Sequence, residues 1–552
     1  MRINSRKIIS LVMCFLCTAA LTACQESGIF INNDENGNAY TLSDQITLSS
    51  TVLRSVDPLT SQDNDFYHIS KLVYDSLVEL DDTLAPQPSL ATEWSVDSEG
   101  RSVTFTLKSG VKFSDGSSLS PKDVVFSYNI CKNADTSPYK HQVQNITKAE
   151  ASGDNKVTFR FRSSDNISLA DFVFPVVSSS QFSSQRDFIN NTDKAVVGTG
   201  RYMITSVDLK QQLKLEANPN YYGEKPTNTI KVSVSPIQTQ YVGFVESGEL
   251  NMIIETAPDR DDVSGNGKLN VTDFTSNEFE TLGFNCASGA CADPALRRAI
   301  AYIVDRDEIK GAAYYNYGTK SDDLYYPGYY GTEIKNTYKP DKDTANENLK
   351  TAGYSDTDGD SMLENADGAE LTLKLAVNAD NVSRKTAAQL IASDLIEYGI
   401  NVSISEVASE SFTSAISSGK YDMFIGGWKV TEDYDLRSFY HSAYSNPAHY
   451  SNTLLDGYLD SMQTGLDNDK MTETLEKAKK IIEDDMPYLC LMYRTYSVVY
   501  TSDLDGIVAP RFNDYYYACD DWKIRVYQDN DDEEKQEDEL ADGTEGAAQQ
   551  DQ

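Results

Sequence analysis

The chain has 552 residues, of which 40% are hydrophobic and 24% charged, a composition typical of soluble proteins with several domains rather than of multi-span membrane proteins. Acidic residues outnumber basic residues 85 to 48, and the formal charge of −37 argues against nucleic acid as a partner, because phosphate binding requires a basic surface. The four histidines form no HExxH motif and no close pair, which argues against a histidine-based zinc enzyme.

The first 24 residues have the pattern of a cleaved export signal. Three basic residues precede an apolar run at residues 8–20, which is shorter than the ~20 residues that a permanent membrane helix needs. The Leu-Thr-Ala-Cys sequence at 21–24 resembles the bacterial lipoprotein box, in which the cysteine is lipidated and becomes the mature N-terminus. We therefore expect a signal peptide at 1–23 and an acylated Cys24 that anchors the protein on the extracytoplasmic face of a membrane.

Both flanks of the main body are polar. Residues 24–40 are rich in glycine and asparagine, as expected of a flexible tether. Residues 529–552 contain eleven acidic residues and one lysine, which predicts a disordered acidic tail. Five cysteines remain between the flanks, and their spacing allows Cys286–Cys291 and Cys490–Cys519 disulfides without fixing the connectivity.

In the body, short strands alternate with helices. Alternating polar and apolar residues predict strands at 101–108 and 156–162, and Ser120-Pro121 predicts the start of a helix between them. The order of these elements predicts an α/β fold with a largely parallel sheet. Further elements are expected as a helix after Asp293, a strand at 371–377, a helix at 384–398, a strand at 402–407, a helix through Phe412 and Ile416, and a strand at 421–427.

Five stretches carry motifs that occur together in one family. They are residues 74–94, 107–128 (LKSGVKFSDGSSLSPKDVVFSY), 197–226, 282–306 and 421–428 (YDMFIGGW). Together they resemble the extracytoplasmic solute-binding proteins of ABC importers, in family 5, which includes oligopeptide- and dipeptide-binding proteins. The resemblance covers about residues 43–525, and its motifs occur in the same order as in the family. This is stronger evidence than a single short motif would be.

The resemblance implies a two-lobed clamshell of the periplasmic-binding-protein type, with an extra α/β subdomain inserted in lobe one. Two chain crossings, near 279–285 and 487–491, would serve as the hinge. A ligand cleft between domains agrees with where pockets commonly form. The expected segments are 41–65, 195–280 and 487–528 for lobe one, 66–194 for the inserted subdomain, and 281–486 for lobe two.

The activity that the resemblance implies is capture of a solute rather than catalysis. The substrate-binding component of an importer closes on an oligopeptide or dipeptide and delivers it to a membrane permease with separate cytoplasmic ATPases. This chain has no Walker GxxxxGK[ST] loop, in keeping with that division of labour. We expect a monomer without enzymatic activity or cofactor.

Motif positions suggest which residues form the two walls of the cleft. Gln62, Asn64 and Asp65 follow Asp57-Pro58 and match the wall of lobe one. Gly426, Gly427 and Trp428 match the wall of lobe two, where glycines let a ligand backbone approach closely. Trp428 fits either stacking on the ligand or packing in the core of lobe two.

Peptide-binding members often place an aspartate shortly after this tryptophan, where it pairs with the ligand α-ammonium. Asp433, followed by Tyr434, is the match in this chain, although the spacing from Trp428 is longer than in the usual pattern. Glu432 and Asp435 are the alternatives. Arg437 and Arg494 are candidates for an anionic group on the ligand, and the eight tyrosines at 314–338 suit both core packing and ligand contact.

The acidic stretch at 356–367 matches part of a calcium-binding loop. Asp356, Asp358 and Asp360 occupy its first, third and fifth positions, and Asp367 falls at the twelfth. The glycine expected at the sixth position is replaced by Ser361. A calcium site and a plain acidic turn are therefore both open.

Two functional alternatives remain. The first keeps the family and changes the ligand to a sugar or a nickel chelate. The second is a tethered extracellular hydrolase, but the adjacent acids at 81–82 and 484–485 do not define a glycosidase pair. Ser417 and Lys420 fit an S-x-x-K pattern without the companion motifs that β-lactamases carry.

Overall fold

The computed structural model describes residues 31–34, 36–163, 168–191, 194–256, 258, 263, 267–463 and 467–527. The predicted signal peptide, the lipidation residue Cys24 and the acidic tail at 529–552 lie outside the described residues. The described residues fall into two compact units. One contains residues up to Asp44 together with 503–505 and the residues from Lys523 onward, and the other contains 45–502 and 506–522.

The smaller unit is a four-stranded antiparallel sheet in the order β1-β2-β20-β19. Its first two strands include residues of the predicted tether at 24–40, so strand structure begins before residue 41. Tyr40 on β2 and Tyr527 on β20 are opposite each other, with ring centroids 5.8 Å apart. The strands are β1 (Asn32–Asn33), β2 (Ala39–Ser43), β19 (Leu504–Asp505) and β20 (Lys523–Tyr527).

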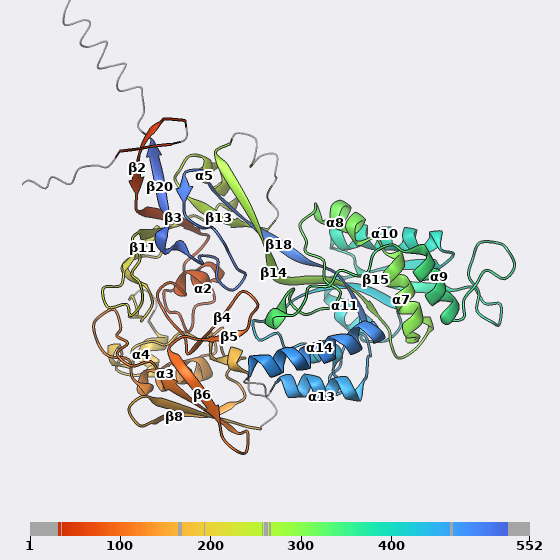
Figure 1. Ribbon diagram of the computed structural model, residues 1–552, viewed down its shortest axis with the longest axis horizontal. Coiled ribbons are helices and arrows are strands. Elements are labelled where there is room, and N and C mark those ends of the chain that lie inside the picture. Colours follow the sequence, from red (N-terminus) through yellow and green to blue (C-terminus); the bar gives the residue numbers. More distant parts are fainter. Residues whose placement is uncertain are drawn as a thin grey trace, which may run out of the picture. The chain divides into compact units, whose positions relative to one another are not determined.

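The larger unit contains a ten-stranded sheet in the part of the chain described (Figure 1). Each neighbouring pair is hydrogen-bonded, so the sheet is continuous from edge to edge. In spatial order its strands are β10 (Tyr202–Asp208), β11 (Gln212–Ala217), β12 (Thr229–Val234), β3 (Gln45–Ser50), β13 (Met252–Glu255), β18 (Tyr488–Thr501), β14 (Leu269–Phe284), β17 (Met423–Lys429), β15 (Thr372–Asn378) and β16 (Asn401–Val407).

This sheet is mixed, and the prediction of a largely parallel sheet was wrong. Parallel pairs join β12 to β3, β3 to β13, β17 to β15 and β15 to β16, whereas the other five neighbouring pairs are antiparallel. The centre is antiparallel because the long strands β14 and β18 pair with each other. Their pairing is irregular between Thr275 and Phe279 and again after Glu280, beside the predicted crossing at 279–285. A hinge role for this region stays a prediction.

A second four-stranded sheet lies within the predicted inserted subdomain. Helix α3 (Pro121–Asn133) packs against it, and Phe105, Phe159 and Phe172 form a mainly edge-to-face aromatic cluster in its core. The Ser120 cap is confirmed, because its side chain and that of Asp123 close a reciprocal capping box. The sheet has the order β6 (Ala91–Val96), β7 (Ser102–Leu107), β9 (Lys156–Phe161), β8 (Ile146–Ser152), and a separate two-stranded pair joins β4 (Val78–Leu80) to β5 (Pro86–Pro88).

Most longer helices occur between β14 and β18. The expected elements of this region are confirmed, with the difference that the strand expected at 421–427 is β17, which continues past its glycines to Lys429. Helix α10 ends at Glu397, and Gly399, just past its C-cap, has a φ of +78°, the left-handed conformation that glycine adopts readily. The helices are α7 (Pro294–Ile303), α8 (Arg306–Tyr314), α9 (Lys342–Thr351), α10 (Val382–Glu397), α11 (Ser409–Ile416), α12 (Arg437–Tyr440), α13 (Thr453–Met462) and α14 (Asn468–Asp485).

The remaining helical elements of the larger unit are short. They are α2 (Asn64–Ser70), α4 (Gln185–Ile189) and α5 (Tyr241–Glu246), with 3-10 turns η1 (Leu169–Phe172), η2 (Ser179–Gln181), η3 (Gln238–Gln240), η4 (Ala290–Ala292), η5 (Tyr329–Gly331) and η6 (Cys519–Asp521). Among the described residues, no helix has both the length and the apolar character needed to cross a bilayer.

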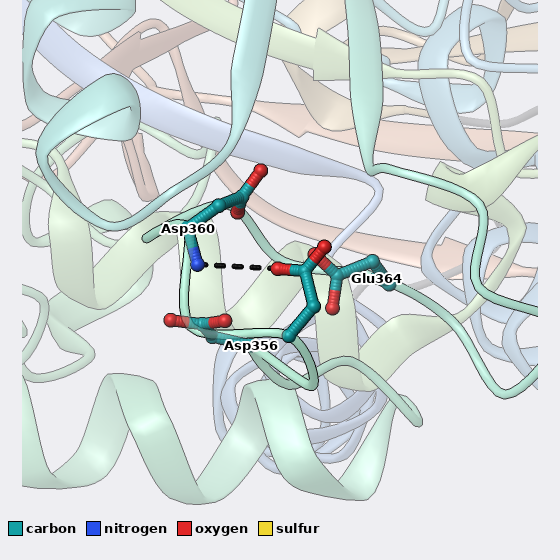
Figure 2. A group of neighbouring side chains, drawn as sticks. Asp356, Asp360 and Glu364 are labelled. Atoms are coloured by element: carbon teal, nitrogen blue, oxygen red, sulfur yellow. Dashed lines mark hydrogen bonds between the residues drawn. The ribbon is translucent and has the colours of Figure 1, made fainter.

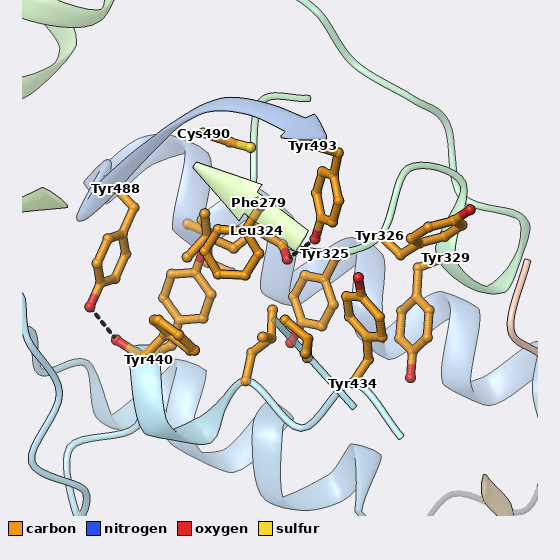
Figure 3. Close-up of a cluster of buried hydrophobic side chains, with 14 of the residues drawn as sticks. Phe279, Leu324, Tyr325, Tyr326, Tyr329, Tyr434, Tyr440, Tyr488, Cys490 and Tyr493 are labelled. Carbon is orange, nitrogen blue, oxygen red and sulfur yellow. Dashed lines mark hydrogen bonds between the residues drawn. The ribbon is translucent and has the colours of Figure 1, made fainter. Parts of the chain in front are cut away.

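Many tyrosines of the 314–338 segment are core residues. Figure 3 shows Tyr325, Tyr326 and Tyr329 in one cluster with Tyr434 and Tyr493. Three of the hydroxyl groups donate to backbone carbonyls, since Tyr493 donates to Leu324 O, Tyr326 to Thr275 O and Tyr329 to Asp433 O. These side chains therefore stabilise the fold.

The five described cysteines are free thiols, so the two disulfides considered from the sequence are not formed. Cys291, Cys490 and Cys519 are buried, and burial raises the pKa of each thiol. Cys519 lies against the Tyr202 hydroxyl and Cys490 lies in the tyrosine cluster, so the residues of the second predicted pair have other neighbours.

Candidate ligand-binding cavity

A cavity of about 530 Å³ lies in the larger unit. This volume falls within the range of about 300–1,000 Å³ that is usual for small-molecule sites. Its walls come from segments far apart in sequence, namely the end of α2, the β4–β5 pair, the loop at 511–517 and the loop after β17. The charged residues that line it are Lys71, Asp75, Glu79, Asp81, Arg201, Glu432, Arg511 and Asp514.

The lining carries both signs of charge, with five carboxylates and three cations. Burial raises the pKa of Glu79, and the neighbouring carboxylates of Asp75 and Asp514 raise it further. A positive ligand group placed here would relieve this repulsion between carboxylates. The cations, in turn, offer sites for a carboxylate. The cavity therefore favours a ligand that has both an ammonium and a carboxylate.

Glu432 is the acidic residue that enters this cavity from the segment after β17. It is 9% exposed, and its Oε1 accepts hydrogen bonds from the Tyr67 hydroxyl at 2.5 Å and from Lys71 Nζ at 3.2 Å. Its Oε2 is buried and has no hydrogen-bond partner among the described residues. A buried carboxylate oxygen without a donor is unfavourable, and a ligand ammonium would supply the missing donor.

Arg511 is the cation of the cavity lining that could complement Glu432 by binding the negative end of a ligand. Its guanidinium lies 3.6 Å from the centroid of the Tyr517 ring, and within the described part of the chain it forms no ion pair. Arg201, by contrast, is paired with Asp520, with Nε 3.0 Å from Oδ1. Because a stacked guanidinium keeps its planar donors available for a carboxylate, Arg511 is the better candidate for the carboxyl end of a ligand.

Asp433, the sequence candidate for the ligand ammonium, does not line this cavity. It lies with Asp435, Arg437 and Tyr329 around a small void of about 10 Å³. Asp433 accepts a hydrogen bond from the Thr431 hydroxyl. Tyr434, the other candidate here, is buried with a φ of +48° and belongs to the tyrosine cluster. The ligand contact predicted for these two residues from the sequence is untested, and the cavity lining favours Glu432 in that role instead.

Asp171 in η1 is a buried carboxyl group beside Asp433. Burial raises the pKa of Asp171 well above its usual value, and Asp433 and Asp435 raise it further against the opposing effect of Arg437. Burial likewise raises the pKa of Asp433. A carboxyl group with a raised pKa binds its proton more tightly in the folded protein than in the unfolded chain. It therefore destabilises the fold above the raised pKa, and this destabilisation disappears as the pH falls toward the ordinary value.

We therefore expect Asp171→Asn to stabilise the protein at pH 7.5 by about 1–2 kcal/mol, in the range for relieving a poorly compensated buried polar group. The difference from the unsubstituted protein should shrink toward zero as the pH approaches 4. Thermal unfolding across this pH range measures it, with the exposed Asp154→Asn as the control. A stability difference that does not change with pH would contradict the assignment.

The two glycines of β17 accommodate side chains of the protein itself. A Cβ on Gly426 would lie 2.4 Å from the Trp428 ring, and one on Gly427 would lie 2.2 Å from Arg384 Nη2 and 2.7 Å from both Glu280 oxygens. Arg384 and Glu280 form a bidentate ion pair at 2.7 and 3.1 Å. The absence of a side chain at these two glycines thus makes room for the Arg384–Glu280 ion pair and for the Trp428 ring. Trp428 is half-buried and packs edge-on against Phe439, with ring centroids 5.2 Å apart.

The candidates in the predicted lobe-one wall lie at the start of α2. Gln62 and Asn64 are exposed, and neither lines the cavity. Asp65 Oδ2 accepts hydrogen bonds from Thr51 N at 2.7 Å and from the hydroxyls of Thr51 and Ser50. These bonds pair the polar groups at the end of β3. A ligand contact by these three residues stays a prediction.

The cations considered from the sequence have intramolecular partners. Arg437 forms a bidentate ion pair with Asp435, and Arg494 lies 3.3 Å from Glu278. The sequence patterns indicated Glu432 only as an alternative ligand-binding residue, and they indicated neither Lys71 nor Arg511. No motif marks these two positions, because the cavity is assembled from segments whose proximity exists only in the folded chain.

Comparison with known proteins agrees with this architecture. The sequence profile of the bacterial extracellular solute-binding proteins, family 5 Middle, matches residues 85–483. The oligopeptide-binding protein AppA of Bacillus subtilis is 24% identical over 81% of this chain and 86% of its own length. The dipeptide-binding protein of Escherichia coli is 23% identical over 81% and 88%. The crystal structure of a nickel ABC transporter protein from Bacillus halodurans superposes with a TM-score of 0.75 at 18% identity, covering 87% of this chain and all of the other.

Proposed function

The chain belongs to family 5 of the bacterial extracellular solute-binding proteins, and from this premise we propose that it captures short peptides in the cavity around Glu432 and delivers them to the permease of an ABC importer. The observation that carries the peptide assignment is the cavity lining, where Glu432 and Arg511 offer opposite charges. A free peptide has these two charges at its ends. The relatives described above as oligopeptide- and dipeptide-binding proteins support the same ligand class.

Calorimetric titration with short unmodified peptides tests this proposal. We expect saturable binding of peptides with free termini, and weaker binding when the amino terminus is acetylated, because acetylation removes the ammonium that Glu432 would receive. Equal affinity for both forms would refute the ammonium role. Binding of neither, with binding of a nickel–histidine complex or an oligosaccharide, would refute the peptide assignment.

A nickel chelate is the second candidate ligand, because the superposed Bacillus halodurans protein is described as a nickel ABC transporter. The described lining of the cavity contains no histidine or cysteine side chain. These are the usual protein ligands of nickel, so a metal here would have to arrive with its own chelator. The charge pair of the lining therefore favours peptide.

The proposal includes a lipid anchor at Cys24, supported by the Leu-Thr-Ala-Cys sequence. Burial of acyl chains contributes about 0.8 kcal/mol per methylene, so more than one chain holds a protein firmly on a membrane. We expect Cys24→Ser to abolish acylation and to shift the protein from the membrane fraction to the soluble fraction. Mass spectrometry of the mature N-terminus measures acylation directly. An unmodified Cys24 in the unsubstituted protein would contradict the anchor and leave the capture function untouched.

The proposal also includes that the protein acts without chemical conversion, as a monomer that needs no cofactor. The relatives are solute-binding proteins. The bound peptide should therefore be recovered unchanged after prolonged incubation, and chromatography of the released ligand measures this. Progressive cleavage of the peptide would favour the hydrolase alternative.

A further inference from the structure

The turn after α9 brings four carboxylates together. One oxygen each from Asp356, Asp358, Asp360 and Glu364 lies within 4.8 Å of all the others, and Figure 2 shows the labelled residues around this turn. Calcium binds oxygen at 2.3–2.6 Å, so two oxygens on one calcium ion are at most about 5 Å apart. The four oxygens therefore lie close enough together to share a single ion. Mg²⁺, with bonds of about 2.1 Å, would require a tighter set.

Glu364 provides an independent indication of a ligand. It is only 5% exposed, and its Oε2 accepts hydrogen bonds from Thr357 N at 2.7 Å and Thr357 Oγ1 at 2.8 Å. Its Oε1 is buried and has no hydrogen-bond partner among the described residues. Figure 2 shows this carboxylate directed toward the turn that carries Asp356 and Asp360. A buried carboxylate oxygen requires a compensating donor or cation.

The part of the chain that the structure describes provides no lysine or arginine partner for the cluster. Among the described ion pairs, none joins a lysine or arginine to any of the four acidic residues. Four like charges at this separation repel one another, most strongly where Glu364 is shielded from water. A bound divalent cation removes this repulsion and also gives the Glu364 oxygen a partner.

The backbone of the turn already has the form of a cation-binding loop. Ser361, at the sixth position, has a φ of +75°, the left-handed conformation for which such loops use glycine. Asp356 accepts hydrogen bonds from Gly359 N at 2.7 Å and Ser361 N at 3.1 Å. The last acidic member is Glu364 at the ninth position, whereas Asp367, the sequence candidate at the twelfth, is outside the cluster.

We propose that Asp356, Asp358, Asp360 and Glu364 bind one Ca²⁺ ion. The ion would stabilise the turn where it is attached to the rest of the larger unit. Leu363 N donates to Gly399 O at 2.9 Å, and Leu371 N donates to Leu363 O at 2.7 Å, directly before β15. None of the four carboxylates lines the ligand cavity, so the calcium site is separate from peptide capture.

The test is thermal unfolding of the full-length protein after treatment with EDTA and transfer to chelator-free buffer, with CaCl₂ or MgCl₂ added at constant ionic strength. Extracellular calcium modules bind with dissociation constants of about 10⁻⁴–10⁻³ M. At 10 mM Ca²⁺ we therefore expect a rise in Tm of about 1–3 °C, and a smaller rise with Mg²⁺. Calorimetric titration with CaCl₂ should give a stoichiometry of one.

Variants distinguish Ca²⁺ binding at this site from a general screening of the protein's negative charge by added cations. Asp358→Asn and Asp360→Asn are exposed substitutions and should reduce the Ca²⁺ affinity at least tenfold. Asp367→Asn, in the same turn but outside the cluster, should leave the Tm rise unchanged. No rise in Tm and no heat of binding at 10 mM Ca²⁺ would overturn the proposal. An equal rise in all three variants would also overturn it, and an equal rise with Mg²⁺ would overturn the choice of calcium.

Discussion

Glu432→Gln is expected to lower the affinity for a short peptide with a free amino terminus by about 100-fold. The substitution keeps the shape of the side chain and removes the charge that would pair with the ligand ammonium. Loss of one partner of a buried charge pair costs about 2–5 kcal/mol, and each 1.4 kcal/mol is tenfold in affinity. The variant should also lose the preference for free over N-acetylated peptides, which calorimetric titration measures.

Two control variants distinguish the explanations of such a loss. Asp433→Asn, one residue along the chain, should keep the peptide affinity within a few-fold of that of the unsubstituted protein, because Asp433 lines a different void. Lys71→Met removes the cation that pairs with Glu432 in this structure. If the Lys71–Glu432 ion pair only holds the two cavity walls together, Lys71→Met and Glu432→Gln will each lower the affinity for free and N-acetylated peptides by the same factor. If Glu432 binds the ammonium, only Glu432→Gln will abolish the discrimination.

Arg306→Met is expected to destabilise the protein by about 3–5 kcal/mol, the cost of removing one partner from a buried, hydrogen-bonded charge pair. Arg306 is 1% exposed, and its guanidinium pairs with Asp322 at 3.0 Å. It also donates to the carbonyl oxygens of Ser321 and Cys490 at 2.6 and 2.9 Å and to Tyr338 O at 2.7 Å. Methionine fills similar volume and would leave these carbonyls and the Asp322 carboxylate without their donor.

Urea unfolding at neutral pH measures this loss. Lys310→Met on the same helix is the matched control, because its charge forms no ion pair in the described structure, and it should change stability by no more than about 0.5 kcal/mol. An Arg306→Met protein as stable as the control would show that the hydrogen bonds between α8, the tyrosine-rich segment and β18 do not contribute as the structure indicates.

Local signals predicted the elements well. The Ser120-Pro121 start of α3 and the Asp293 cap of α7 are both formed, because a cap depends only on residues within one turn of itself. The sheet order could not be predicted in the same way. Strands β14 and β18 pair across more than 200 residues of sequence, and no pattern inside either strand specifies its partner. The antiparallel centre of the sheet follows from that pairing.

The candidate site was harder to predict for a related reason. Three acidic residues lie within four positions after β17, and the sequence favoured Asp433 with Glu432 and Asp435 as alternatives. The backbone at Tyr434 has a positive φ, and the folded chain places Glu432 in the large cavity while Asp433 faces the small void. Likewise, the β17 glycines suggested room for a ligand backbone, whereas the space beside Gly427 is filled by the Arg384–Glu280 ion pair.

The central claim is that the cavity around Glu432 holds a short peptide. Native mass spectrometry of the protein purified without denaturation, followed by release and identification of bound species, tests it most directly. The account predicts a set of short peptides with free amino termini that is depleted in Glu432→Gln and retained in Asp433→Asn. A single non-peptide solute, bound equally by both variants, would contradict it.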